Sequence, residues 1–297
     1  MLNKIVTVLL LLLISLSTRA DTGSIHIIIP AGAGGQIDIM CRDLEKAITQ
    51  RLNRHSYCDF KPGAGGYIGL QQVAKTRTNE VVVSMLDTMS MAGMFINFKD
   101  ISIDDYHYIG MVGNTSIGLA MNKAHMMQIN DVKTIADNGV GGLTHYHTWE
   151  LANRIKHDIL SVPFKNRGDL VSSLLNQDVD AMWGTATSLQ AYEQTGKVVI
   201  IAVVGPRRLP QLPAIPTFAE LGYKNFGIQS SWLVFSNASA DPATLLQLRE
   251  ILAQPVFGEA SGVIPDPTNF AKSRELIQES MQTQAKFIDY IKSLNNK

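Results

Sequence analysis

Hydrophobic residues gather in short runs along the chain, and most runs end at a loop of small or polar residues. Residues 24–29 (SIHIII) are almost continuously apolar and β-branched, which is typical of a strand covered on both faces. Runs of this kind predict strands at residues 24–29, 57–60, 81–86, 116–121, 160–163, 179–183, 198–204 and 230–235.

Between these runs, apolar side chains recur at the spacing of a helix with one buried face. This periodicity predicts helices at residues 39–52, 168–175, 242–253 and 267–294. Two more follow glycine-rich segments: one comes after residues 61–69 and ends at residue 75, and the other opens at residues 139–144 and ends at residue 155. Strands that alternate with helices indicate an α/β fold with parallel strand pairs. Residues 122–138 are more polar and the pattern then starts again, so we predict a second unit, from which the last third of the chain returns to the first.

Three glycine-rich loops, at residues 32–38, 63–69 and 139–144, each precede a predicted helix. Glycine lets successive N–H groups converge on one point, and a helix N-terminus adds partial positive charge there. Such loops bind anions without lysine or arginine. The alternative is that the glycines only turn the chain tightly, but three loops at corresponding strand ends favour an anion site.

The first loop also invites comparison with a dinucleotide-binding loop, with Asp59 as the partner of a ribose hydroxyl. Ile37 occupies the position of the third glycine that this motif needs for close helix packing, which argues against it. The chain has no G-x-S-x-G, H-E-x-x-H or P-loop motif. These observations argue against an enzyme.

Polar residues beside the loops have simpler interpretations. Asp38 is predicted to cap the first helix, with Arg42 one turn further on as its ion-pair partner. His145 and His147, two residues apart, would point to different sides of a helix or to one side of a strand, and no third metal ligand is evident. His145 is either a surface residue or a hydrogen-bond donor at a cleft.

Composition and charge narrow the class of partner. Hydrophobic residues make up 45% of the 297 residues and charged residues 18%, which excludes a disordered chain. The 26 basic and 26 acidic residues cancel, so the chain has no strong field for nucleic acid or an anionic membrane. Neither is predicted as a partner.

The first 20 residues read as a secretory signal peptide. Lys4 precedes the apolar run 5–16, and the small residues of 17–20 predict cleavage after Ala20. The run is too short for a spanning helix, which argues against the alternative of a retained anchor. Export places Cys41 and Cys58 in an oxidising compartment, where they either form a disulfide or remain two buried thiols.

Several segments in order along the chain resemble one known family, the Bug periplasmic solute-binding proteins of tripartite tricarboxylate transporters. The resemblance covers residues 25 to 252. It is carried by a proline, double-glycine, aspartate and arginine segment, a second glycine loop and later proline-rich pieces, at residues 30–42 (PAGAGGQIDIMCR), 61–69 (KPGAGGYIG), 162–165 (VPFK), 207–210 (RRLP), 212–222 (LPAIPTFAELG) and 231–232 (SW).

This resemblance implies an α/β periplasmic binding protein with two lobes (a Venus flytrap), each a mixed β-sheet flanked by helices. Domain I would comprise residues 21–120 and 225–297, and domain II residues 121–224. A small organic carboxylate would lie between the lobes, held by main-chain amides. The ligand-binding residues carried over by position are Gly34, Gly35, Gln36, Thr88, Ser90, Gly142, Thr144 and His145.

The chain departs from the family pattern at two places. Residues 77–80 (RTNE) stand where the family has a Pro-Asp-Gly-Tyr turn, so that turn is expected to be reshaped. Gly184 stands where many members have an aspartate able to pair with a ligand ammonium. On that basis we expect a plain carboxylate to be preferred over an amino acid.

The resemblance therefore predicts a periplasmic, non-enzymatic receptor, a monomer without cofactor or metal, which delivers its carboxylate to the membrane permease subunits of a tripartite tricarboxylate-type transporter. Two other functions stay open. One is a sensor that presents the liganded protein to a membrane kinase, and the other is a small exported enzyme.

Overall fold

The computed structural model describes residues 23–77, 80–137, 139, 142–164, 167–258, 261–266 and 271–295. The predicted signal peptide, residues 1–20, lies outside the described residues, as do Val140 and Gly141 of the third glycine loop. None of the helices in the described part is both long and apolar enough to span a bilayer.

The first of two five-stranded sheets begins with three parallel strands in the order β2-β1-β3, and β10 and β4 extend it on the β3 side. β10 is antiparallel to both of its neighbours, so the sheet is mixed. The strands are β1 (Ile25–Ile29), β2 (Ser56–Phe60), β3 (Val82–Asp87), β4 (Tyr106–Thr115) and β10 (Ser230–Asn237).

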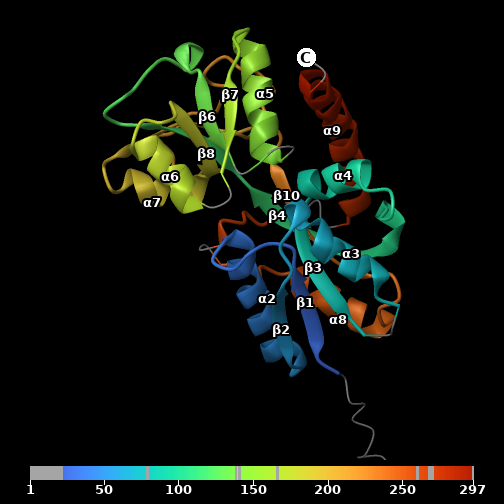
Figure 1. The fold of residues 1–297 in the computed structure, drawn as a ribbon. Coiled ribbons are helices and arrows are strands. Elements are labelled where there is room, and N and C mark those ends of the chain that lie inside the picture. Colours follow the sequence, from blue (N-terminus) through green and yellow to red (C-terminus); the bar gives the residue numbers. More distant parts are fainter. Residues whose placement is uncertain are drawn as a thin grey trace, which may run out of the picture.

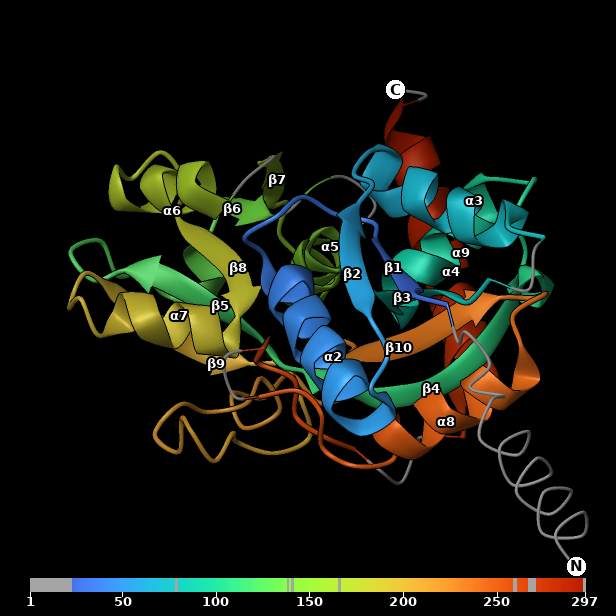
Figure 2. The same cartoon turned by 90° about the horizontal axis from the view of Figure 1, so that it is seen from below.

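The second sheet repeats this arrangement in the order β7-β6-β8-β5-β9, with β6 parallel to β7 and β8 and with β5 antiparallel to β8 and β9. Its strands are β5 (Ile117–Asn122), β6 (Thr134–Asp137), β7 (Leu160–Pro163), β8 (Ala181–Thr185) and β9 (Val198–Val203). Each sheet and its helices form one lobe, and the lobes lie side by side (Figures 1 and 2). The predicted two-lobed α/β fold is confirmed. We call the lobe of the first sheet lobe I and the other lobe II.

Helices connect the strands and cover the sheets. They are α2 (Gln36–Leu52), α3 (Tyr67–Lys75), α4 (Thr88–Asn97), α5 (Leu143–Ile155), α6 (Arg167–Leu175), α7 (Ala186–Glu193), α8 (Pro242–Leu252) and α9 (Ser273–Asn295), with short 3₁₀ turns η1 (Ala64–Gly66), η2 (Ile103–Asp105) and η3 (Ile129–Asp131). In both lobes the helix that follows the third parallel strand, α4 or α7, begins directly at the strand's end. The two lobes therefore share one plan.

The chain changes lobes twice. It leaves the first sheet at Ser116, between β4 and β5, and returns after β9 to form β10. The predicted boundary after residue 120 falls inside β5, because the strand that follows the junction pairs entirely in the second sheet. The predicted return of the chain's last third to the first unit agrees with the place of β10.

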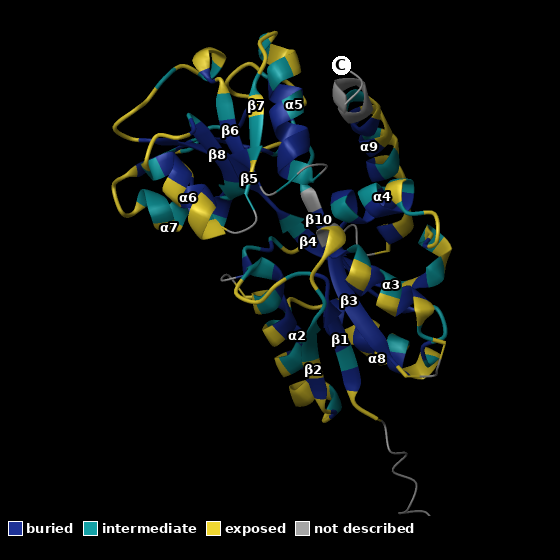
Figure 3. Ribbon diagram, in the orientation of Figure 1, coloured by how far each residue is buried: buried dark blue, intermediate teal, exposed yellow. Residues whose placement is uncertain are grey.

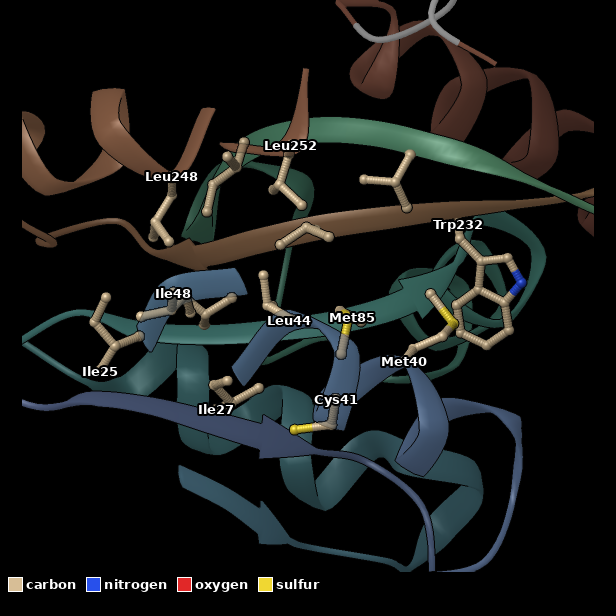
Figure 4. Close-up of a cluster of buried hydrophobic side chains, with 14 of the residues drawn as sticks. Ile25, Ile27, Met40, Cys41, Leu44, Ile48, Met85, Trp232, Leu248 and Leu252 are labelled. Atoms are coloured by element: carbon tan, nitrogen blue, oxygen red, sulfur yellow. The ribbon is translucent and has the colours of Figure 1, made fainter. Parts of the chain in front are cut away.

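Alternate residues of β1 pack on opposite faces of the first sheet. Ile27 and Ile29 contact α2 residues such as Leu44, whereas Ile28 packs with α3 and α4 residues. Figure 4 shows the first of these cores, which Leu248 and Leu252 of α8 share with Leu44 and Ile48 of α2. Buried residues follow the strands of both sheets, and exposed residues gather on the outer sides of the helices (Figure 3).

The N-terminal boundary of α2 differs from expectation. The helix begins at Gln36 with Gly35 as its N-cap, so the prediction of Asp38 as the N-cap is wrong. Asp38 lies within the first turn, and its carboxylate accepts a hydrogen bond from the Gly34 N–H at 2.9 Å. The predicted ion pair of Asp38 with Arg42 is present at 3.3 Å.

A disulfide joins Cys41 of α2 to Cys58 of β2, which answers the question that the sequence left open. The bond closes a loop with a sequence separation of 17 residues. In the chain-entropy model such a loop stabilises the fold by about 3 kcal/mol. We therefore expect the Cys41→Ala/Cys58→Ala variant to unfold at lower temperature than the oxidised wild type. Equal melting temperatures for oxidised and fully reduced wild-type protein would contradict this prediction.

Candidate ligand-binding site

A cavity of about 560 Å³ lies between the lobes. Lobe I supplies the start of α2, the carboxyl ends of β3 and β4 and one side of α4. Lobe II supplies the start of α5 and the carboxyl end of β8. The lining residues are Gln36, Ala64, Asp87, Ser90, Gly93, Met94, Asn97, Phe98, Thr115, Ile117, Gly139, Gly142, Leu143, Thr144, Arg167, Thr185 and Trp232.

All three glycine-rich loops reach this cavity. The first contributes Gln36, the second Ala64, and the third Gly139 and Gly142. The expectation that these loops share one crevice is therefore confirmed. Their convergence follows from topology, because each loop leaves the carboxyl end of a parallel strand and such ends meet at one edge of a sheet.

The eight residues carried over from the resemblance divide into two groups. Four line the cavity: Gln36, Ser90, Gly142 and Thr144. The other four, Gly34, Gly35, Thr88 and His145, are outside its lining.

Two helices that begin at the cavity, α2 and α5, have a glycine as N-cap, Gly35 and Gly142 respectively. Glycine has no side chain to accept hydrogen bonds from the first turn, so main-chain N–H groups there are available to a bound anion. One of these helices belongs to lobe I and the other to lobe II. An anion between them would draw on donors from both lobes.

The Thr115 hydroxyl orders the lobe I side of the site. It accepts hydrogen bonds from Nε2 of Gln36 at 2.7 Å and from Nε1 of Trp232 at 2.8 Å. Both acceptor positions of the oxygen are thereby occupied, which leaves its own hydrogen as a donor. The sequence pattern did not single out Thr115, because its two partners come from distant segments of the chain.

His145 is buried rather than on the surface, with 9% of its side chain exposed. Its ring lies edge-on to Phe287 of α9, with ring centroids 4.9 Å apart. Burial lowers the pKa of His145, and burial likewise raises that of the neighbouring Asp137. The expectation of a surface position is therefore wrong. It missed α9, which comes from the far end of the chain.

His147, two residues further on, faces the interior of lobe II, and its Nε2 lies 3.1 Å from the carbonyl oxygen of Ile228. Both histidines lie on α5 and point to different sides of it, which is the first of the two predicted alternatives. Across the part of the chain that the structure describes, no group of three histidine, cysteine, aspartate or glutamate side chains is arranged to hold a metal ion.

Two charged residues of the lining escaped the sequence interpretation. Asp87 ends β3 and caps α4, where its Oδ1 accepts a hydrogen bond from the Ser90 N–H at 3.0 Å. Burial raises the pKa of Asp87. Arg167 begins α6 on the opposite lobe and is exposed. The sequence did offer a signal for Asp87. It directly follows the strand predicted at residues 81–86 and directly precedes Thr88, a predicted site residue.

Gly184 does not border the cavity. A Cβ built on it would lie 2.9 Å from a methyl carbon of Leu189 on α7. A side chain at this position would therefore point into the packing of lobe II. The preference for a plain carboxylate, which rested on the absence of an aspartate here, stays a prediction.

Comparison with known proteins agrees with this geometry. The chain is 24% identical to protein BugT of Bordetella pertussis over 252 residues, which span 80% of this chain and 77% of that protein. The solved periplasmic binding protein BugD has 20% identity and a TM-score of 0.76, with 91% of this chain and 97% of that chain covered. A Rhodopseudomonas palustris protein solved with adipate has 15% identity and a TM-score of 0.76, with 92% and 98% covered.

A family model described as the tripartite tricarboxylate transporter family receptor matches residues 40–291. This match covers well over half of the 297 residues and includes parts of both lobes. The chain therefore belongs to the tripartite tricarboxylate transporter receptor family, as its resemblance to the Bug proteins indicated.

Proposed function

We propose that this protein is a periplasmic receptor that captures a small organic carboxylate in the cavity between its lobes. The observation that carries the proposal is the convergence of three glycine-rich loops and two glycine-capped helix N-termini on that one cavity. Such main-chain donors suit a carboxylate, because hydrogen bonds to an ionised acceptor are about twice as strong as neutral ones. A cavity of about 560 Å³ is within the usual range for a small-molecule site.

The related structure with adipate supports the ligand class, since that protein shares the fold and holds a dicarboxylate. We further propose that the receptor acts as a monomer in the periplasm and delivers its ligand to the permease subunits of a tripartite transporter. Family membership supports this partnership. The proposed role of the cavity is to bind the ligand, without a catalytic step.

A thermal-shift titration of residues 21–297 tests the ligand class. The probes are succinate, glutarate, adipate, citrate and benzoate, each matched with its neutral amide. A ligand that binds only the native state at 100 times its dissociation constant adds about 2.7 kcal/mol of stability. For a chain of this size we expect a rise in melting temperature of roughly 5 to 10 °C.

The neutral amides serve as controls because they keep the shape of each acid and remove its charge. At least one acid should raise the melting temperature with increasing concentration while its amide does not. If no acid in a wider panel of carboxylates outperforms its amide, the proposed ligand class is wrong.

A further inference from the structure

Asp87 and Arg167 are the two charged side chains in the described lining of the cavity, and they come from different lobes. Asp87 is 8% exposed at the junction of β3 and α4. The cap hydrogen bond from the Ser90 N–H compensates part of this burial, but a negative charge in a site for anions disfavours a ligand that brings no cation, because like charges repel across a medium of low dielectric.

Helix capping does not require this negative charge. In lobe II, Thr185 occupies the corresponding place between β8 and α7, caps that helix by accepting from the Ser188 N–H, and also lines the cavity. A neutral residue thus does in one lobe what Asp87 does in the other. Since asparagine, serine and aspartate cap helices about equally well, the charge of Asp87 calls for a separate explanation.

Arg167 supplies the opposite charge. Its guanidinium makes no ion pair or hydrogen bond with any other described residue, although it borders the cavity as the first residue of α6. A guanidinium presents five donors in a planar fork that matches the two oxygens of a carboxylate. This side chain is therefore placed to receive a second carboxylate, beyond the one held by the main-chain amides.

We propose that Asp87 and Arg167 set the specificity of the cavity for an amino diacid, whose ammonium binds Asp87 and whose second carboxylate binds Arg167. The inference rests on the proposed carboxylate receptor and narrows its ligand class. It departs from the expectation of a plain carboxylate, which depended on Gly184, a residue outside the cavity lining.

Isothermal titration calorimetry with two matched pairs tests the proposal. The pairs are L-glutamate with glutarate and L-aspartate with succinate, which differ only by the ammonium group. The wild type should bind one of the amino diacids at least tenfold more tightly than its partner, a difference of about 1.4 kcal/mol. Asp87→Asn keeps the helix cap and removes the charge, so the preference should fall at least tenfold.

Two further variants make the test specific. Arg167→Gln should weaken both members of a pair to a similar degree, because both carry the second carboxylate. Asp131→Asn removes an aspartate from an exposed turn away from the cavity and should leave the preference unchanged. Asp87→Ser repeats the charge removal with another good capping residue, and the melting temperature of each variant shows whether it folds.

The proposal is overturned if the wild type binds the plain diacid as tightly as its amino counterpart, or if Asp87→Asn and Asp87→Ser fold but keep the preference. It is also overturned if none of these four compounds binds while another carboxylate does. In each of these cases the carboxylate receptor itself can still stand. That function fails separately, when no carboxylate stabilises the protein at all.

Discussion

Replacing Phe287 with alanine is expected to lower the free energy of unfolding by about 3 to 5 kcal/mol, the usual range for a fully buried phenylalanine. Phe287 lies on α9 with 0% of its side chain exposed. Its loss would leave a void that the surrounding rings cannot fill without moving. The melting temperature should fall by on the order of 10 °C.

The position of Phe287 makes this residue more than a local packing element. Its helix, α9, packs on α4 of lobe I, yet its ring lies 5.6 Å from the rings of both Tyr146 and Trp149 on α5 of lobe II. Figure 1 shows α9 rising beside α4 toward α5. The cluster therefore links the two lobes, and it does so on the helix whose first turn borders the cavity.

A matched control is available on α8. Leu246 is a large apolar residue with 60% of its surface exposed, so Leu246→Ala removes apolar atoms without opening a buried void. We expect that variant to change stability by less than about 0.5 kcal/mol. If Phe287→Ala melts within one or two degrees of Leu246→Ala, the α9 cluster does not hold the lobes together.

Much of the fold was predictable because its strands are short apolar runs and its glycines mark the turns between strand and helix. The predicted elements around residues 24–86 and 139–204 correspond to strands and helices of the two lobes. Besides the short 3₁₀ turns, two helices and two strands of the described residues were missed: α4, α7, β4 and β6. β6 has four residues and falls in a polar segment, so periodicity had little to act on. α4 is rich in methionine and buried on several sides, which hides the helical period.

The site was predictable where the main chain forms it and obscure where side chains do. Glycine-rich loops can be recognised directly in the sequence, and the three predicted loops do share a cavity. The direction of a side chain depends on sheet register and on neighbours from distant segments. Gly184 shows this, because only the packing of α7 on β8 reveals that its Cβ would face Leu189. Likewise, only the arrangement of the two lobes shows that Asp87 and Arg167 line the same cavity.

A loss of stability between pH 6.5 and pH 4 is the second large effect that we expect, and its source is His147. This side chain is fully buried, and burial lowers its pKa to about 4. Its Nδ1 has no hydrogen-bond partner among the described residues, so a second ring proton would be buried without an acceptor. In the unfolded chain the pKa returns to about 6.5.

The sign follows from these two values. Between about pH 4 and 6.5 the unfolded chain binds a proton at this residue that the folded protein does not, so stability falls as the pH falls. The full contribution is present above pH 6.5 and is lost progressively toward pH 4. The difference between these two pKa values corresponds to roughly 3 kcal/mol. Asp87 acts in the opposite sense, because a carboxyl whose folded pKa is raised favours the folded state at low pH.

Variants distinguish the contribution of His147 to the pH dependence of stability from that of other titratable groups. Urea unfolding of His147→Gln at pH 7.5, 5.5 and 4.5 should show a flatter dependence on pH than the wild type, even though the variant starts from lower stability. His125→Gln removes an exposed histidine and should reproduce the wild-type slope. If His147→Gln loses stability toward acid as steeply as the wild type does, the buried imidazole is not the group that titrates. The acid sensitivity would then have to come from other groups, such as His145, whose pKa burial also lowers, or carboxyl groups, whose window lies at lower pH because their unfolded pKa values are near 4.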